Sequence, residues 1–465
     1  MSGKHERIHE EMDECERFEI ERPQAEEAAK TVAQSAQSTR GLDLRTIAEV
    51  VNMSEGTEVT FYATIQTLRS VSPTLDVLHF RDRTGSIHGM LSRTALPMTK
   101  SLRLSPETFV QVYGTLQKPL PRVSKFGLEV AIYSILPLHE IYDEPEYSLA
   151  EMTARILDLR LPSNKSLFRI RAMVLRNFRQ VLEDREFIEI HTPKLQPAAT
   201  EISAETFEVD YYGRPASLAH NSQLANQLAI ESGFARVYEA GPVFGAKVSK
   251  TQGTLAESIN VEIGMTFGRS YHDLIQIVDD MLKSVFAAKQ AIPELRVVRE
   301  RWPSKDIVWL EETPIITVKE ALHMLQIDGQ NIAKEHSALR DDVRLGALVK
   351  DKYMTDYFIL DELSTNKRPI SVELAEGRHW TDLFSIFLRG QSICTGGQWV
   401  PSKTELWDMM KQTQATEDDN GNCPSGLDLS TPPHGGASIC LEHFLEVLLE
   451  LDGVTCASLF HSDSG

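Results

Sequence analysis

Four short runs of alternating apolar and polar residues lie from about residue 57 to about residue 137, and they restrict what the first part of the chain can form. They are "EVTFYATIQTL", "TLDVLHFRDRTGSIHGMLS", "TFVQVYGTLQKP" and "GLEVAIYSILPL". A period of two residues places apolar side chains on one face of a strand. Gly85, Gly114 and Gly127 lie between or within these runs, and the turn at 82–85 joins two strands as a hairpin. The pattern predicts a small antiparallel barrel of about five strands.

Such a barrel is an OB-fold pattern, a common platform for single-stranded nucleic acid. Its aromatic and basic residues could stack on bases and meet phosphates: Phe80, Arg81, Arg83, Lys118, Arg122 and Lys125. Of these, Phe80, Arg81 and Lys118 are the predicted tRNA-binding residues. The alternative is that Phe80 is a core residue and the cations are solvated surface groups. A net charge of −19 means that any RNA binding depends on a local basic patch.

The chain of 465 residues is too long for one ordinary core, so two domains and a tail are expected. Residues 1–45 hold too little apolar surface to pack, which predicts a flexible acidic tail. The barrel domain is assigned to residues 46–140, a linker to 141–165 and a larger domain to 166–465. That domain opens with an amphipathic helix from Leu167, followed by the strand "FIEIHTPKL", which Pro193 stops.

Composition favours a cytoplasmic protein without a metal site. No run approaches the roughly eighteen apolar residues that a membrane span requires, and the first residues are charged where a secretory signal is apolar. The five cysteines are scattered and form no CxxC, so free thiols are expected instead of a disulfide framework or a zinc site. His434, Cys440 and His443 are close in sequence, but Cys440 lies in an apolar strand and is interpreted as core.

Many separate stretches, in the same order, resemble a eukaryotic-type aspartyl-tRNA synthetase, a class II synthetase, over roughly residues 55–465. They are "ILDLR", "FIEIHTPKL", "GPVF", "LVKDKYMTDYFILDE", "RPI", "LFSIFLRG", "PPHGGASICLE" and "SLF". The resemblance implies an α+β protein, with an N-terminal anticodon-binding OB barrel followed by an antiparallel sheet flanked by helices. It also implies a homodimer formed through "EFIEIHTPKL". A shared fold does not by itself establish a shared function.

The residues that hold ATP in this family are replaced here. The hairpin "GPVFGAKVSKTQGTLAESINVEIGM" has Gly245 and Lys247 where relatives have an arginine for the α-phosphate and a carboxylate. His443 stands at the position of the arginine for the γ-phosphate, and "GQSI" puts Gln391 and Ser392 at the Mg²⁺ carboxylates. A histidine cannot make the bidentate phosphate contact of a guanidinium, and Mg²⁺ requires hard anionic oxygens. The resemblance therefore predicts that ATP-dependent activation is lost, so neither ATP nor Mg²⁺ is required.

The amino-acid pocket differs as well. Relatives hold the aspartate side chain with a lysine and an arginine, and this chain has Asn226 and Trp399 at those positions. Glu201 and Gln223, which match positions that contact the substrate amino group, remain, while a family carboxylate becomes Gly264. We hypothesise that a cationic aminoacyl group such as arginyl pairs with glutamates while Trp399 stacks on its guanidinium. The glutamates proposed for this contact are Glu201, Glu205 and Glu257, and Arg389, in "LFSIFLRG", is assigned to substrate binding on the resemblance alone.

A synthetase scaffold that makes no adenylate can still use aminoacyl-tRNA, which is already an activated ester. We predict an aminoacyl-tRNA-dependent aminoacyltransferase that forms a dipeptide or diketopiperazine. Such an enzyme resembles the fungal arginine-containing cyclodipeptide synthases. The partners are then aminoacyl-tRNA, with arginyl-tRNA as one candidate, and a second copy of the chain. Glu201 or His220 is the candidate base, and Gln223, Asn226 or Lys247 the candidate oxyanion donor. Glu201, His220 and Lys247 are thus the predicted catalytic residues.

Two other functions stay open at this point. One is a dimeric tRNA-binding or regulatory protein without catalysis, and the other is an aspartate–tRNA ligase with unusual ATP contacts. Individual residues also have structural interpretations: His220 and His443 as hydrogen-bonded histidines, Ser222 as a helix N-cap instead of a nucleophile, and Glu201 as a solvated loop carboxylate.

Overall fold

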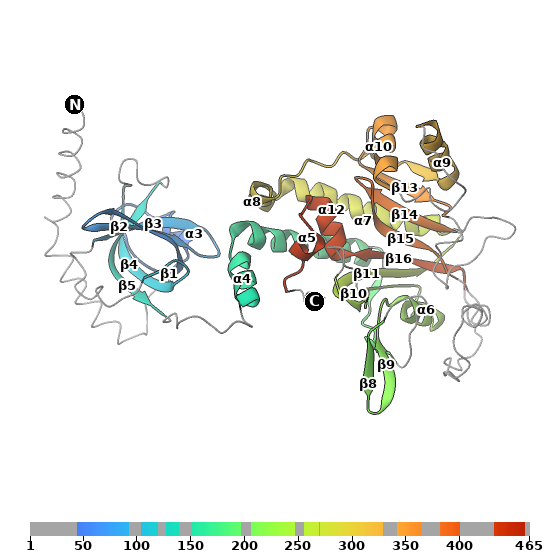
Figure 1. The fold of residues 1–465 in the computed structure, drawn as a ribbon, viewed down its shortest axis with the longest axis horizontal. Coiled ribbons are helices and arrows are strands. Elements are labelled where there is room, and N and C mark those ends of the chain that lie inside the picture. Colours follow the sequence, from blue (N-terminus) through green and yellow to red (C-terminus); the bar gives the residue numbers. More distant parts are fainter. Residues whose placement is uncertain are drawn as a thin grey trace. The chain divides into compact units, whose positions relative to one another are not determined.

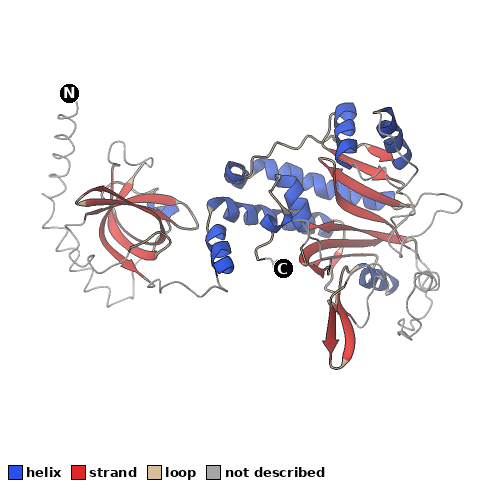
Figure 2. Cartoon of the chain, viewed as in Figure 1, coloured by secondary structure: helices blue, strands red, loops and turns tan. Residues whose placement is uncertain are grey.

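The computed structural model describes ten segments of the chain, which belong to two compact units at 1–146 and 147–465. The described segments are 44–92, 104–119, 127–138, 150–196, 206–246, 255–268, 270–328, 342–363, 382–399 and 432–460. Figure 1 shows a barrel in the first unit and a large sheet with helices in the second. Figure 2 shows the same division by secondary structure, with strands in red and helices in blue. No described helix is long and apolar enough to cross a membrane.

The predicted five-stranded barrel is confirmed, and its pairing is antiparallel except between the strands at 86–92 and 129–137, which run parallel. Its strands close in the order β1-β2-β3-β5-β4, and a short helix α3 (Ile47–Val50) accompanies them. The strands are β1 (Glu58–Ser72), β2 (Leu75–Arg81), β3 (Ser86–Ser92), β4 (Phe109–Gln117) and β5 (Glu129–Pro137). Asp82 fixes the turn between β2 and β3, because one carboxylate oxygen accepts from the backbone of Thr84 and Gly85 while the other accepts from Ile47 N. The turn residue therefore also holds helix α3.

The three predicted tRNA-binding residues of the barrel have different environments. Phe80 is fully buried and packs edge-to-face on Phe61, so its ring has no open face for a base, and the core interpretation replaces stacking. Arg81 is buried too, and it donates to both oxygens of Glu107 at 2.6 and 2.7 Å. Lys118 is exposed and lies 3.3 Å from Glu55. Of the three, Lys118 alone has a side chain that solvent, and hence a phosphate, can reach.

The second unit begins with helices α4 (Ala150–Leu159) and α5 (Pro162–Glu183), so part of the segment expected to be a linker is helical. Its main sheet has eight strands in the order β12-β13-β14-β15-β16-β11-β10-β6. Pairing is antiparallel throughout, apart from β12 with β13 and β10 with β6. The strands are β6 (Ile188–Glu189), β10 (Arg236–Phe244), β11 (Glu257–Thr266), β12 (Ile315–Thr317), β13 (Tyr357–Asp361), β14 (Leu383–Leu388), β15 (Gln391–Gln398) and β16 (His434–Cys440).

Helices cover the two faces of this sheet unequally. The main core lies on one face, under α5, α7 (His272–Ala291), α8 (Glu294–Arg301) and α12 (Leu441–Leu449). On the other face, α9 (Val318–Ile327) and α10 (Asp342–Tyr353) pack near β13, and α6 (Gln223–Glu231) packs near β10 and β11. A separate small sheet is built from β7 (Leu195–Gln196), β8 (Glu208–Tyr211) and β9 (Arg214–Leu218), and a 3-10 turn η5 (Val454–Ala457) follows α12. The face with α6, α9 and α10 keeps a polar strip between them.

Two cationic side chains bind backbone carbonyl groups at the C-terminus of helix α12. Arg389, at the turn between β14 and β15, donates to the carbonyl oxygens of Val447 and Lys305 at 3.1 and 2.6 Å and lies 3.2 Å from Glu450. Lys289, which is 2% exposed, donates to Leu448 O at 2.8 Å. These bonds satisfy helix carbonyls that lack intrahelical partners. The guanidinium of Arg389 is thus engaged with the protein, in contrast to the substrate-binding role predicted for it.

Lys289 should make stability depend on pH. Burial is the main reason why the pKa of Lys289 falls from 10.5 to about 8. Repulsion from Arg389 and Arg299 contributes a smaller part of this decrease. Below that pKa both the folded and unfolded chains hold the proton, and above it only the unfolded chain does until its own pKa is passed. Stability from this group therefore rises as pH increases from about 8 to about 10.5, by up to about 2–3 kcal/mol. Urea unfolding measures the free energy of unfolding of wild type and Lys289→Met across this pH window. The value for wild type should rise relative to that of the variant as pH increases. A constant difference between the two proteins would contradict this prediction.

Candidate active site

A row of polar side chains crosses five strands of the large sheet, on the face opposite the main core. Each member is paired in register with the next. Glu239 of β10 pairs with Glu262 of β11, Glu262 with Ser438 of β16, Ser438 with Thr395 of β15, and Thr395 with Ser385 of β14. Because side chains alternate along a strand, these five point away from the apolar core that includes Val261 and Ile263. The row forms the floor of the candidate site.

The two carboxylates of this row are held by neighbours. Glu262 is 5% exposed and accepts from Ser438 Oγ at 2.7 Å and from Asn260 Nδ2 at 3.1 Å. Glu239 is 2% exposed, accepts from Thr192 Oγ1 at 2.6 Å and lies 2.9 Å from Lys194 Nζ. Burial opposes ionisation of Glu239, but hydrogen bonds from Thr192 and Lys194 outweigh it and keep the pKa of its carboxyl below the usual value.

One row along, three in-register glycines leave bare backbone on the same face. Gly264, Gly436 and Gly397 lie side by side on β11, β16 and β15, between Val237 and Leu383. Trp399, just after β15, covers them: a Cβ on Gly436 would lie 2.2 Å from its Cζ2, and a Cβ on Gly264 would lie 3.2 Å from its Cη2. The indole is 4% exposed and packs with Val237, Leu383 and Ile230.

Asn226 reaches the same place from helix α6. Its Cβ would lie 3.4 Å from a Cβ on Gly264, and the residue is fully buried. Neither Oδ1 nor Nδ2 of Asn226 has a hydrogen-bond partner among the described residues, and the same is true of Ser222 Oγ one turn earlier. Each such buried polar group costs about 1–3 kcal/mol. The structure thus brings together Asn226 and Trp399, which the sequence assigned to one pocket.

At the loop end of strand β10, Gly245 lies beside His220. A Cβ on Gly245 would lie 3.7 Å from the imidazole of His220, whose Nδ1 lies 3.1 Å from Phe244 O. Gln223, the first residue of α6, has its backbone N bonded to Asn221 Oδ1 at 3.1 Å. An imidazole thus borders the glycine at the position where relatives have an arginine, and it cannot make the bidentate phosphate contact of a guanidinium.

The other replaced positions also meet. His443 Nε2 lies 3.2 Å from Ser392 O and its Nδ1 3.1 Å from Glu446 Oε2. Ser392 Oγ is 2.6 Å from Ser385 Oγ, which belongs to the polar row, and Gln391 is the preceding, exposed residue. The hydroxyl of Ser392 thus joins the polar row, and the imidazole of His443 contacts the backbone of the same residue. In the described part of the chain, no group of three or more histidine, cysteine or carboxylate residues is arranged to hold a metal ion.

Glu257 lies on the wrong face to form a cage with Trp399. It is exposed at the start of β11, next to Ile259, which packs on the main core, whereas Gly264 under Trp399 faces the open side. Trp399 itself is buried, so no ring face is free for a guanidinium. Both observations correct the predicted stacking of an arginyl group between these two residues. Glu201, Glu205 and Lys247 lie outside the described residues.

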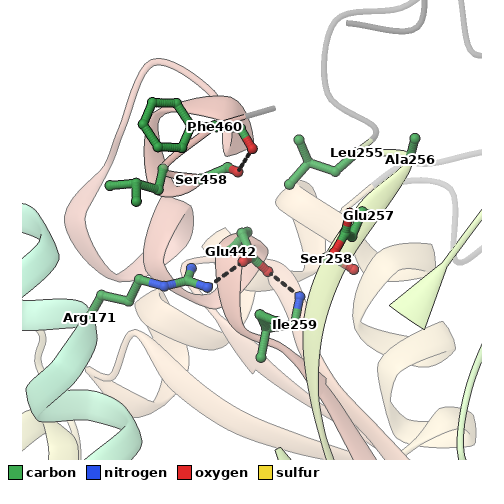
Figure 3. A pocket seen from close by; sticks show the side chains of 10 residues that line it. Arg171, Leu255, Ala256, Glu257, Ser258, Ile259, Glu442, Ser458 and Phe460 are labelled. Carbon is green, nitrogen blue, oxygen red and sulfur yellow. Dashed lines mark hydrogen bonds and ion pairs between the residues drawn. The ribbon is translucent and has the colours of Figure 1, made fainter. Parts of the chain in front are cut away.

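Glu257 instead lines a pocket of about 250 Å³ on the helix side of the sheet, together with Leu255, Ser258 and Phe460 (Figure 3). At its base, the buried carboxylate of Glu442 lies 2.7 Å from Arg171 and accepts from Ile259 N at 2.9 Å. Figure 3 shows Glu442 between these two partners, one from helix α5 and one from strand β11. The carboxylate of Glu442 therefore connects the start of helix α12 to strand β11.

Removing that carboxylate should be costly. Glu442→Ala leaves the largely buried guanidinium of Arg171 without its ion pair and Ile259 N without its acceptor, so unfolding free energy should fall by about 3–5 kcal/mol. Glu442→Gln keeps an acceptor for Ile259 N and should lose less than half as much. Denaturant unfolding measures both. A cost below about 1 kcal/mol for the alanine variant would contradict the structural role of this contact.

The polar row and the glycine row were not predicted from the sequence. The alternation in "RVYEAGPVF" and "ESINVEIGM" contains their signal, because each carboxylate stands between two apolar neighbours that face the core. Their partners Ser438, Thr395 and Lys194 come from other strands or loops, so only the register reveals the row.

Comparison with known proteins fits this architecture. The cytoplasmic aspartate–tRNA ligase of Caenorhabditis elegans is 30% identical over 410 residues, which cover 80% of this chain and 76% of that protein. The aspartate–tRNA(Asp/Asn) ligase of Methanopyrus kandleri is 29% identical over 90% of this chain and 97% of its own. The aspartyl-tRNA synthetase structure from Entamoeba histolytica superposes with a TM-score of 0.75 at 25% identity, covering 92% of this chain and 93% of that one. Residues 148–464 match the family described as tRNA synthetases class II (D, K and N), and this chain belongs to that family.

Proposed function

We propose that this chain uses aminoacyl-tRNA as an acyl donor and no longer activates an amino acid with ATP. The observation that supports this proposal is the chemistry of the four positions where the family resemblance implies phosphate and Mg²⁺ contacts. They hold Gly245, Gln391, Ser392 and His443, and none is an arginine or a carboxylate. Adenylate formation brings ATP against a carboxylate, so it depends on electrostatic stabilisation that these residues do not supply.

The reaction we propose is aminolysis of the tRNA ester. The amine of one aminoacyl group attacks the ester carbon of another, a C–N bond forms, the C–O bond to the terminal ribose breaks, and the proton of the amine passes to the ribose oxygen. The remaining free amine can attack the second ester in the same way, which closes a diketopiperazine and releases the second tRNA. No ATP is consumed, because each ester already carries the activation.

Within the described residues, His220 is the group best suited to move that proton. It lies at the start of the hairpin, beside Gly245, and an imidazole nitrogen can accept a proton and pass it on. Glu201 and Lys247 stay proposals for the same step, and Gln223 or Asn226 for stabilising the oxyanion. We propose a cytoplasmic location by analogy with the cytoplasmic ligase of Caenorhabditis elegans. We also propose a homodimer formed through the segment with β6, as the family resemblance implies.

Arginyl-tRNA is the first donor to test, as the source of an arginine-containing cyclodipeptide. Glu201 and Glu205 remain the proposed partners of its guanidinium, now without Glu257 and Trp399. The test incubates the purified protein with a full set of charged tRNAs, without ATP, and analyses dipeptides and diketopiperazines by mass spectrometry. A product that contains one constant amino acid supports the transferase. No product with tRNA still bound would favour a non-catalytic tRNA-binding protein instead.

A further inference from the structure

A pocket between the start of strand β11 and residues 458–460 carries an inference that goes beyond the proposed function and does not depend on it (Figure 3). We propose that this pocket binds a small organic cation with a short alkyl stem, whose charge pairs with Glu257 and whose stem lies on Phe460. Arg171 of helix α5 and Ile259, which packs on the main core, also line the pocket. It therefore lies on the opposite side of the sheet from the polar row and the glycine row.

One wall of the pocket is apolar, exposed and held in place. Leu459 and Phe460 are 48% and 61% exposed. Arg155 of helix α4 binds the backbone of this segment, since its Nη2 donates to Ser458 O at 2.5 Å and its Nε donates to Leu459 O at 3.2 Å. Because these bonds exist before a ligand arrives, less conformational freedom is lost when an alkyl stem packs on Phe460.

The second wall is the start of β11, which is fixed by its pairing with β10. Glu257 pairs with Phe244, and Gly245 N donates to Ala256 O at 3.0 Å. The pocket has a volume of about 250 Å³. At about 30 Å³ for each water molecule, this is the space of about eight waters, so a ligand of about eight heavy atoms fills it and a nucleotide is too large.

The lining carries one negative charge that is not balanced. At the base of the pocket, Arg171 and Glu442 lie 2.7 Å apart, so their charges cancel, and the second oxygen of Glu442 accepts from Ile259 N at 2.9 Å. Glu257 is exposed, and it forms no ion pair with the described residues. A cation in the pocket gains this carboxylate as a partner, whereas an anion is repelled by it.

The ligand needs an alkyl part as well as a charge. An ion pair with an exposed carboxylate contributes little by itself, because water screens it. Contact of methylene groups with Phe460 and Leu255 removes apolar surface from water, and the ring of Phe460 also attracts a cation. An alkylguanidinium or alkylammonium ion combines the two contributions. A neutral ligand of the same shape keeps the apolar contact and loses the ion pair.

The test titrates the full-length protein with butylguanidinium chloride and, separately, with butylurea, and follows binding by ligand-observed NMR. The two ligands have the same number of heavy atoms and nearly the same shape, and only the first is charged. We expect butylguanidinium to bind with a Kd of about 1 mM or below, and butylurea to bind about fivefold more weakly. Glu257→Gln should weaken butylguanidinium about fivefold and leave butylurea unchanged. Phe460→Ala should weaken both ligands about threefold or more.

Both substituted side chains are exposed, so the two variants should fold as wild type does, which urea unfolding checks. Glu208→Gln is the matched control, because it removes an exposed carboxylate of strand β8 outside the pocket and should leave both affinities unchanged. Equal binding of the two ligands, or no detectable binding of butylguanidinium, would overturn the proposal. An equal loss in Glu208→Gln would also overturn it, since the acidic surface as a whole would then attract the cation. Binding that neither Glu257→Gln nor Phe460→Ala changes would place the ligand elsewhere and overturn the proposal as well.

Discussion

Aspartate-dependent exchange of pyrophosphate into ATP should be at least about 10⁴-fold slower with this protein than with the ligase of Caenorhabditis elegans, because removal of one electrostatic contact typically costs about 10²–10³. Here two arginine positions hold Gly245 and His443, and the carboxylate positions hold Gln391 and Ser392. The ring nitrogens of His443 are engaged with Ser392 O and Glu446, which leaves little of the residue for a phosphate. The loss should affect every amino acid equally, since the missing groups contact ATP.

The exchange assay needs the Caenorhabditis elegans ligase as positive control in the same buffer, and each of the twenty amino acids in turn. Exchange with aspartate within about tenfold of the control would identify a divergent ligase that binds ATP by other residues. Exchange with another single amino acid would show that activation persists with changed specificity. Either result would contradict the loss of ATP-dependent activation.

Gly436→Ala should unfold the large domain or leave it insoluble. An added Cβ would lie 2.2 Å from Ile263 O on the neighbouring strand and 2.2 Å from Trp399 Cζ2. The indole could move only by displacing the apolar side chains packed on it, and the carbonyl belongs to the β11–β16 ladder and cannot move without spreading the strands. We expect a loss of more than about 4 kcal/mol, a large part of the stability of a typical domain.

Gly264→Ala, in the same row, is the matched control. Its nearest atoms would be side-chain atoms of Trp399, Ile230 and Asn226 at 3.2 to 3.4 Å, so the site can adjust, at a cost of about 1–2 kcal/mol. Adding Trp399→Ala should not rescue Gly436→Ala, because the clash with Ile263 O remains. Denaturant unfolding of the domain measures these variants. Equal costs for the two glycines would contradict the described packing.

The sequence predicted the barrel and the class of the large domain because both depend on local patterns. Alternating strands, a turn at Asp82 and a helix followed by a strand and Pro193 can each be recognised within a few residues. Position on one face or the other is harder to predict, because a shift of one residue reverses it. Phe80 and Glu257 were assigned to ligands on residue type, and both face elsewhere in the structure.

The residues of the candidate site could be predicted where they match positions of the family. They could not be predicted where they become neighbours only through pairing of strands that are distant in sequence. Asn226 and Trp399 were assigned to one pocket and do meet, but the burial of Trp399 depends on Gly436 and Gly264, which local patterns do not relate to it. The polar row was hidden for the same reason, since Glu262 and Ser438 become neighbours only through the β11–β16 register. Arg389 was assigned from its motif alone, while its partners at the end of α12 are distant in sequence.

The most direct measurement is the rate at which the protein consumes the ester of aminoacyl-tRNA when ATP has been removed with apyrase. Each tRNA is charged with labelled amino acid, and loss of acid-precipitable label is followed with and without the protein. We predict that at least one charged tRNA loses its acyl group at least about tenfold faster with the protein, at a rate that added ATP does not change. No acceleration with any charged tRNA, or acceleration only when ATP is present, would contradict acyl transfer from aminoacyl-tRNA as the activity of this protein.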